Sequence, residues 1–306
     1  VTSIGFEAGT LTQHLCYGLQ EAGYEVMCLE ARQVSAALAA MRNKTDKNDA
    51  RGIAQVLRTG WYSRVYVKSF ESHVIRALLS SRKAVLSKCV DLENVVRGLI
   101  RLVGIKLPPR LRHSRFDPVC RDLIEPHEQL ATCIVALLDA RKALYDIYLD
   151  LDRRVQDIAK NDPVCKRFMT IPGVGTITAV TFKAAVDDPS RFRRSRTVAA
   201  HFGLTPRRFQ SGELDNAGSI SKAGDSDVRA ALYLAARSLL VKSEQWSGLK
   251  SWGIKLAKTK GHRKAVTALA RKMAVIGDPS RSPADRHQFI HDKRDARTLM
   301  LVNRTQ

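Results

Sequence analysis

The sequence predicts a chain of three parts: an α/β segment at the N-terminus, a long helical middle with coiled-coil spacing, and an all-α C-terminal region. Short apolar runs alternate with helical stretches before residue 71, which is an α/β pattern. Leucines recur at every seventh position through the middle, which is typical of a coiled coil. Beyond Pro163 the spacing of apolar residues is helical as far as about Ile276. The 306 residues give room for about two domains.

The N-terminal segment, residues 1–70, is predicted to be a small α/β domain. Its expected elements are strands at 1–6 and 24–29 and helices at 11–22, 33–41 and 46–57. Two strands with their helices bury little apolar surface, so this sheet is too small to be complete. A further strand is therefore expected near residues 65–67, or the chain begins inside a domain.

The middle, residues 71–160, is predicted to hold two long helices. The breaker LPPR at 107–110 separates a helix over 71–102 from one over 118–158. The second helix carries an unbroken heptad row of Leu123, Leu130, Leu137, Leu144, Leu151 and Ile158. A second row is partial, because His127 and Arg141 interrupt it. These rows indicate a coiled coil, either an antiparallel hairpin with 71–102 or a seam between two copies. A long helix packed inside an all-α domain is the simpler alternative.

The third part, residues 161–276, is predicted to be helical and to begin after Asn161-Asp162-Pro163. One of its helices is expected to start near Asp225. Residues 277–306 are polar and unpatterned, and they are expected to be mostly disordered.

The charge of the chain points to a polyanionic partner. The formal net charge is +21 and the pI is about 10.1, and each cationic side chain placed on a phosphate releases condensed counterions. No acid lies between Asp188 and Glu213, and that stretch holds Arg191, Arg193, Arg194, Arg196, Arg207 and Arg208. A second acid-free stretch, from Gln245 to Gly277, holds Lys250, Lys255, Lys258, Lys260, Arg263, Lys264, Arg271 and Lys272. Nucleic acid is the favoured partner, and a solvated cationic face or an anionic membrane surface is the alternative.

Several function classes lose support from the sequence. The longest uncharged stretch, which ends at Phe182, is far shorter than the ~20 apolar residues of a membrane span. No secretory signal is visible, and the six cysteines form no CxxC pair, which disfavours a zinc site or a disulfide framework. A reducing cytoplasmic location is expected from these cysteines. No GxxxxGK[ST] phosphate loop and no HExxH motif occurs.

The string IPGVG, residues 171–175, resembles the turn of a helix-hairpin-helix module. Its paired glycines, Gly173 and Gly175, let backbone N–H groups approach a phosphate at the start of the next helix. A GxG turn also serves as a plain helix connector. Together with nearby cations, the candidate nucleic-acid contacts are Gly173, Gly175, Arg193, Arg194, Arg207, Arg208 and Lys222.

Three carboxylates are candidate metal ligands. Asp46 and Asp49 stand three apart at the start of a predicted helix, which places both near one face, and Glu7 directly follows the first predicted strand. Clustered carboxylates can hold Mg²⁺ together with phosphate oxygens of a substrate. The alternative is that Thr45 or Asp46 caps the helix and Asp49 complements its dipole.

Ser211 is the candidate nucleophile. It follows the Arg207-Arg208 pair in a glycine-containing stretch that is predicted to be a loop and that could receive a phosphodiester. No His-Asp partner pattern accompanies it, and an ordinary turn serine is the alternative reading. The string SISK at 219–222 matches S-x-x-K but lacks the companion motifs of that enzyme class, so Ser221 and Lys222 are assigned to a loop before the next helix.

Five strings, taken together and in order, resemble the DEDD transposases of bacterial insertion sequences, which are recombinases related to the Piv invertase. They are FEAGTLTQHL, KTDKNDARGIAQ, IPGVGTITA, HFGLTPRRFQSGE and SISKAGDSDVRAALY. The resemblance extends from about Ile4 to Ile276. It implies a partial RuvC-like (RNase-H-like) catalytic domain at 1–70, truncated at its N-terminus, a helical coiled-coil region at 71–160 and a C-terminal transposase domain at 161–276.

The resemblance also implies a chemistry. The family binds divalent metal, Mg²⁺ or Mn²⁺, with four carboxylates, of which three fall here on Glu7, Asp46 and Asp49. The family's serine nucleophile falls on Ser211, which would form a transient phosphoserine link to DNA. Members are directed by a structured guide RNA, so DNA and RNA are the expected partners. A second copy of the chain is also expected, through the helical region.

The sequence departs from the family pattern at both ends. The family's first aspartate lies on a strand well before the glutamate, whereas here only six residues precede Glu7, so this ligand is expected to be missing. Similarity stops after Ile276, and the tail reads like a shifted reading frame. Besides DNA transposition or site-specific recombination, two other functions are therefore kept open: a catalytically inactive nucleic-acid-binding remnant, and a junction-resolvase-like nuclease without strand transfer.

Overall fold

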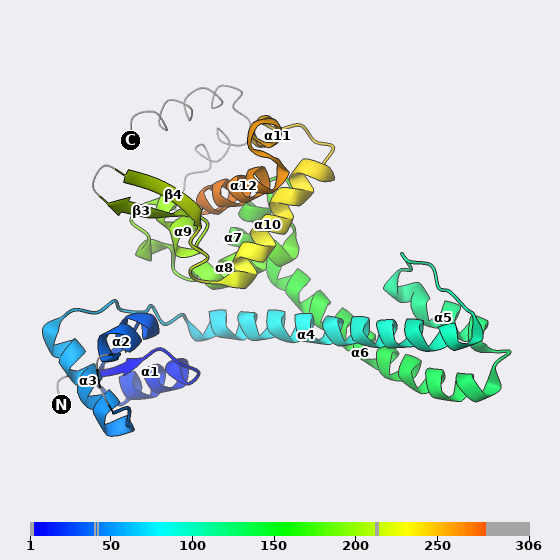
Figure 1. Ribbon diagram of the computed structural model, residues 1–306, viewed down its shortest axis with the longest axis horizontal. Helices are drawn as coiled ribbons and strands as arrows, with labels where there is room; N and C mark the ends of the chain where they lie inside the picture. Colours follow the sequence, from blue (N-terminus) through cyan, green and yellow to red (C-terminus); the bar gives the residue numbers. More distant parts are fainter. Residues whose placement is uncertain (1–2, 40, 42, 212–213, 280–306) are drawn as a thin grey trace. The chain divides into compact units, whose positions relative to one another are not determined.

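The computed structural model describes residues 3–39, 41, 43–211 and 214–279. These residues form two compact units, divided between Phe70 and Glu71 (Figure 1). The predicted tail from residue 280 onward lies outside the described residues. None of the described helices is both long enough and apolar enough to cross a membrane.

The first unit is a small α/β layer. Its elements are β1 (Ser3–Glu7), α1 (Thr12–Glu21), β2 (Glu25–Leu29), α2 (Ala31–Leu38) and α3 (Asp46–Thr59). β1 and β2 run parallel, with Ile4 opposite Val26, so α1 is the crossover of a βαβ unit. Buried Leu29, Val34 and Val56 form the core between the strands and α2 and α3.

The further strand expected near residues 65–67 is not formed. Arg64 makes a single antiparallel bridge with Leu29, and the Val65 N–H donates to the Cys28 carbonyl at 2.8 Å. Within the described residues the sheet of this unit therefore has two strands, and an RNase-H-like fold remains a prediction.

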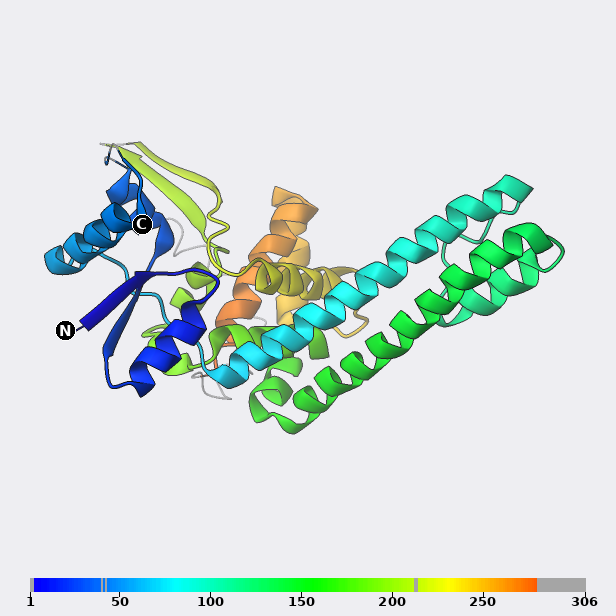
Figure 2. The ribbon, with the colours of Figure 1, turned by 90° about the horizontal axis from the view of Figure 1, so that it is seen from below.

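The second unit begins with an arm of long helices. They are α4 (Phe70–Leu99), α5 (His113–Ile124) and α6 (Glu128–Asn161), with a short 3₁₀ turn, η1 (Ile100–Val103), after α4. Figure 2 shows α4 and α6 running alongside one another. They are antiparallel, because Arg82 near the start of α4 bonds Asp152 near the end of α6, while Glu93 bonds Arg141 farther along.

The single long helix predicted over 118–158 is wrong. Pro126 has no N–H to donate, so the helical hydrogen bonds stop after Glu125, which is still helical, and the chain turns at His127 before α6. Pro118, in contrast, lies inside α5. The LPPR stretch separates α4 from α5 as predicted.

Heptad spacing is present along α6, but the most buried row is not the leucine row. Ile134, Leu138, Arg141, Val155 and Ala159 are buried, which follows the alternating four- and three-residue spacing of a helix seam. The leucine row is half-buried or exposed, with Leu123 39% exposed on α5. A coiled coil in the strict sense remains a prediction.

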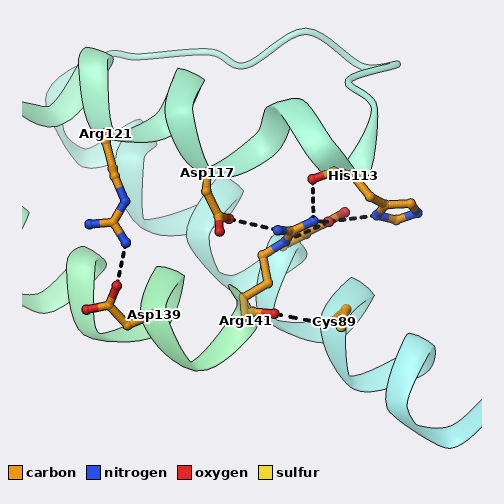
Figure 3. A network of polar contacts seen from close by, with 7 residues as sticks. Cys89, His113, Asp117, Arg121, Asp139 and Arg141 are labelled. Atoms are coloured by element: carbon orange, nitrogen blue, oxygen red, sulfur yellow. Dashed lines mark hydrogen bonds and ion pairs between the residues drawn. The ribbon is translucent and has the colours of Figure 1, made fainter. Parts of the chain in front are cut away.

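A buried polar network joins the three helices of the arm (Figure 3). The Arg141 guanidinium donates to Glu93 Oε1 at 2.6 Å, to Asp117 Oδ1 at 2.8 Å and to the His113 carbonyl at 2.6 Å. His113 Nδ1 lies 2.7 Å from the same Glu93 oxygen. The Arg141 side chain is only 2% exposed, so its buried charge is compensated by these carboxylates, and its N–H groups are satisfied by them and by the His113 carbonyl.

The rest of the second unit is a helical bundle with one hairpin. Its elements are α7 (Pro163–Met169), α8 (Thr176–Val186), η2 (Pro189–Arg191), α9 (Ser195–His201), β3 (Pro206–Ser211), β4 (Leu214–Ile220), α10 (Ser226–Val241), α11 (Gly248–Lys260) and α12 (His262–Ile276). The rings of Phe168, Phe182 and Phe202 meet in its core, with successive centroids 4.5 and 5.7 Å apart.

The prediction of an all-α C-terminal region is wrong for residues 206–211 and 214–220. These residues form the antiparallel hairpin β3–β4, which stands at the edge of the bundle (Figure 1). Every side chain of β3 is exposed, so the strand has no buried face and shows no apolar alternation that would reveal it in the sequence. The helical remainder agrees with the prediction, including α10, which follows its N-cap residue Asp225.

Candidate nucleic-acid interface

The three candidate metal ligands all belong to the first unit. Glu7 is exposed and ends β1, which places it within the strand rather than after it. Asp46 and Asp49 lie in the first turn of α3, and Thr45 is the N-cap residue, with its Oγ1 accepting from the Asn48 N–H at 3.2 Å. Thr45, and not Asp46, therefore caps this helix.

The carboxylates of Glu7, Asp46 and Asp49 make no hydrogen bond or ion pair within the described part of the chain. Their oxygen chemistry suits Mg²⁺ or Mn²⁺. However, no group of three or more His, Cys, Asp or Glu side chains among the described residues is close enough to hold a metal ion. Among the described residues, the three carboxylates therefore have no hydrogen-bond or ion-pair partner, and they do not lie together as a metal site.

The candidate nucleophile Ser211 lies in the second unit, on the hairpin. It is exposed and ends β3 opposite Leu214, so it is a strand residue and not a loop residue as predicted. Strand geometry fixes the direction of its side chain, because successive side chains point to opposite faces. Phe209 and Ser211, two residues apart in the regular part of β3, therefore share one face, whereas Arg207 lies at the register shift between Pro206 and Arg208.

The base of the hairpin is held rigidly by backbone contacts. The Ser221 N–H donates to the Thr205 carbonyl at 2.9 Å and the Lys222 N–H donates to the Gly203 carbonyl at 3.1 Å. A Cβ at Gly203 would lie 2.3 Å from the Ala223 nitrogen, so only glycine allows this approach. Lys222 adopts a left-handed backbone conformation, with φ of 56°.

Arg229 of α10 fixes the same loop from the other side. Its Nη1 donates to the carbonyls of Ala223 at 2.6 Å, Gly224 at 3.1 Å and Phe202 at 3.2 Å. One guanidinium thereby joins α10, the end of α9 and the loop that follows β4. The sequence did not predict this role of Arg229, because the string DVRAA indicates only the start of a helix.

The loop is also tied to the arm. Asp225 caps α10 by accepting from the Asp227 and Val228 N–H groups at 2.9 and 3.2 Å, and its other oxygen accepts from Arg76 of α4. Burial alone would raise the pKa of Asp225, but the hydrogen bond and charge of Arg76, with the two N–H groups, outweigh it and hold the pKa below its usual range. The Asp225 carboxylate therefore stays ionised and keeps α4 beside α10.

Arginines precede this hairpin in the sequence, and two more stand on β3. Arg207 Nη2 donates to the Ser221 carbonyl at 3.2 Å, and Arg207 and Arg208 are exposed. Arg193 and Arg194 are exposed just before α9, and Arg191 lies over the Phe192 ring at 4.4 Å. An exposed, acid-free stretch of this kind suits phosphate contact.

The predicted helix-hairpin-helix turn lies between α7 and α8. Gly173 has φ of +91°, and a Cβ there would lie 2.5 Å from the Ala235 carbonyl oxygen, so Gly173 packs against α10. A Cβ at Gly175 would meet nothing within 4 Å. Gly175 is the N-cap residue of α8 and borders a hollow of about 240 Å³ that Asp152 and Gln156 of α6 also line. The two glycines thus face different surroundings.

Cysteine chemistry has little support. All six cysteines are free, and only Cys133 is exposed. Burial raises the pKa of Cys165 to about 12 and of Cys120 to about 11, so both stay neutral thiols near pH 7.

Comparison with known proteins identifies two domains in this chain. Residues 165–252 match the family described as Transposase IS116/IS110/IS902 family, and residues 2–105 match the DEDD domain of the IS110 elements, described as Transposase. The first match covers α8 to α10 with the hairpin, and the second covers the three carboxylates.

Similar proteins carry the same description. The transposase for insertion sequence element IS1111A of Coxiella burnetii is 32% identical over 242 residues, which are 76% of this chain and 65% of that protein. The transposase for IS1328 of Yersinia enterocolitica is 29% identical over 76% of this chain and 70% of that protein. The pilin gene-inverting protein of Moraxella bovis is 31% identical over 110 residues, 35% of this chain and 33% of that protein. The chain thus spans just under two thirds of the Coxiella relative.

Proposed function

This chain carries both domains of the IS110/IS116 insertion-sequence transposases, and from that premise we propose that it cuts and rejoins DNA with Ser211 as its nucleophile. The observation that carries the proposal is the hairpin β3–β4. It holds a serine exposed at the end of a strand, in an acid-free stretch with six arginines, on a base fixed by Arg229.

The proposed step is a transesterification. The Ser211 oxygen attacks a DNA phosphorus, a bond forms between that oxygen and phosphorus, and the bond from phosphorus to the leaving deoxyribose oxygen breaks. The serine proton passes to water, and the leaving oxygen takes up a proton. The number of phosphoester bonds is unchanged, so the link can be reversed when a deoxyribose hydroxyl attacks the phosphoserine. Arg207 and Arg208 stabilise the negative charge that develops on the phosphate.

Covalent capture tests this step. The full chain is mixed with DNA carrying the ends of its own element, the reaction is stopped in denaturant, and DNA that remains attached to protein is measured. We expect an adduct that maps to Ser211 and is absent in Ser211→Ala. Cleavage without an adduct would instead support a resolvase-like nuclease that uses water, and binding without either product would support an inactive nucleic-acid-binding protein.

We also propose that Glu7, Asp46 and Asp49 are ligands of a divalent metal. Support comes from their lack of any partner in the described chain and from the DEDD domain match that covers them. A bound Mg²⁺ or Mn²⁺ would act as a Lewis acid on the scissile phosphate. Calorimetric titration of the full chain with Mn²⁺ should show binding that Asp49→Asn weakens by at least tenfold. Unchanged Mn²⁺ binding in this variant contradicts the assignment.

Two partner proposals complete the function. A structured guide RNA is proposed because a second acid-free cationic stretch, over α11 and α12, lies apart in sequence from the hairpin arginines.

A second copy of the chain is proposed to contact the half-buried leucine row of α6, with exposed Ile147 beside it. Sedimentation velocity of Leu144→Glu against the unchanged chain tests the second contact, because a charge in the seam should release monomers.

A further inference from the structure

Phe209 is an exposed ring in the middle of the hairpin. Its side chain is 62% exposed, and it stands on β3 between Arg208 and Gln210. Since side chains alternate along a strand, Phe209 shares a face with Ser211, and both lie beyond the register shift between Pro206 and Arg208. Two residues along a strand span about 7 Å, so the ring lies one or two nucleotides from any phosphate held at Ser211.

The opposite strand leaves space for this ring. A Cβ at Gly218 would lie 3.3 Å from Phe209 Cε2, so glycine at that position lets the ring rest on the hairpin. Phe209 is not part of the bundle core, and it makes no ring–ring or cation–π contact within the described residues. The ring therefore contributes little to the fold and presents a flat apolar surface to solvent.

The charge around the ring selects one kind of partner. No acidic residue occurs from 189 to 212, and arginines precede the ring directly. A flat ring flanked by cations matches a nucleotide, which offers a planar base and an anionic phosphate at the same time. An apolar protein surface would match the ring but not the arginines.

We propose that Phe209 is a stacking platform for a nucleobase of the DNA strand whose phosphate Ser211 receives. This inference rests on the proposed function and adds a binding site to it. Arg207 contacts a neighbouring phosphate, and Phe209 stacks on an unpaired base beside it. Stacking is tolerant of base identity, so the site positions the strand without reading its sequence.

Photocrosslinking of the full chain tests the site directly. The probe is a single-stranded DNA of mixed sequence in which thymine is replaced by 5-iodouracil, which crosslinks to rings stacked on it. We expect an adduct that maps to the peptide containing Phe209 and is lost in Phe209→Leu, which keeps an apolar side chain but not the flat ring. Adducts that map elsewhere, with none on Phe209, overturn the proposal.

Affinity for the same probe gives a second measurement. Phe209→Ala should weaken binding roughly five- to hundredfold, and Phe209→Trp should bind like the unchanged chain. The dependence of log K on log salt should keep its slope in Phe209→Ala, whereas Arg207→Gln should reduce the slope by about 0.7, because only the arginine neutralises a phosphate. Leu234→Ala, at a position 60% exposed on α10, is the matched control and should bind normally.

The two proposals fail in different ways. If Ser211 is not the nucleophile, covalent capture fails while the crosslink to Phe209 remains. If Phe209 is not the platform, the crosslink and the affinity loss are absent while the Ser211 adduct still forms.

Discussion

Gly173 and Gly175 stand in one turn, but only Gly173 is closely packed, so substitution by alanine should destabilise the fold more at Gly173 than at Gly175. Gly173→Ala combines a φ of +91° with a Cβ 2.5 Å from the Ala235 carbonyl oxygen, so α8 and α10 must separate. We expect a loss of about 1–3 kcal/mol in the free energy of unfolding. Gly175→Ala meets open space but replaces a glycine at the N-cap of α8, so it should cost less, about 0.5–1 kcal/mol. Urea denaturation gives the free energy of unfolding of each variant. Equal losses in the two variants would show that the turn is not packed as described.

The Arg76–Asp225 pair gives the fold a pH dependence that can be assigned to one residue. Because the pKa of Asp225 is held below its usual range, the pair stabilises the folded chain fully above about pH 4. That contribution is lost as pH falls through the lowered pKa. Arg76→Met should reduce the free energy of unfolding by roughly 1 kcal/mol at pH 7, since Arg76 is 38% exposed.

Denaturation at pH 7 and at pH 3 tests this assignment. The difference between Arg76→Met and the unchanged chain should shrink at the lower pH, as Asp225 becomes protonated in both. Lys83→Met is the matched control, because its pair with Asp227 is highly exposed on both sides. A difference that grows toward acid contradicts the direction given for Asp225.

At the scale of elements, the arm depends on a buried charge that its own helices must compensate. Arg141→Met would leave Glu93 and Asp117 buried without a cation, with side chains 9% and 13% exposed. We expect a loss of about 3–5 kcal/mol. Asp139→Ala removes the exposed Arg121–Asp139 pair of the same two helices and should cost less than about 1 kcal/mol. Thermal unfolding followed by circular dichroism compares the two variants.

The double variant Glu93→Met with Arg141→Met refines the test. If the loss in Arg141→Met comes from stranded charge, removing the Glu93 carboxylate as well should recover part of the stability. No recovery would mean that packing of the long arginine side chain, and not its charge, holds the helices together.

The helices and the parallel strand pair were predictable because each buries an apolar face with its own period. Thr45, Asp162 and Asp225 also cap helices, as residues of these types commonly do. The break at Pro126 was missed because the leucine row continues through it without a change of spacing. The β3–β4 hairpin was missed because all side chains of β3 are exposed, and an exposed strand carries no alternation.

The candidate site was predictable in part for a related reason. Glu7, Asp46, Asp49 and Ser211 came from motifs, and a motif gives positions without the contacts that surround them. Arg229 anchors the hairpin through three carbonyls, yet its role depends on chain reversals that bring residues 202 and 223 together. Phe209 did have a sequence signal, since it stands two residues before Ser211, but only the strand assignment gives that spacing a meaning.

At the scale of the whole molecule, the 21 excess positive charges are not distributed evenly along the chain. The arm pairs many of its charges internally, as Arg154 does with Asp150 and Arg82 with Asp152. The stretch from 189 to 212, which leads into the hairpin and includes β3, contains six arginines and no acid, and the next acids along the chain are Glu213 and Asp215. Such a distribution predicts that nucleic-acid affinity depends on where the cations lie, and not on net charge alone.

Two variants that remove the same charge separate these possibilities. In one, Arg193, Arg194, Arg207 and Arg208 are changed to Gln, and in the other, Lys83, Lys88, Arg153 and Arg154 of the arm. For double-stranded DNA, the slope of log K against log salt should become less steep by about 3.6 in the first variant, if each arginine neutralises one phosphate. In the arm variant the slope should stay near that of the unchanged chain. Equal changes in both would show that binding follows the overall field of the protein, and the hairpin would lose its place as the site where DNA is held.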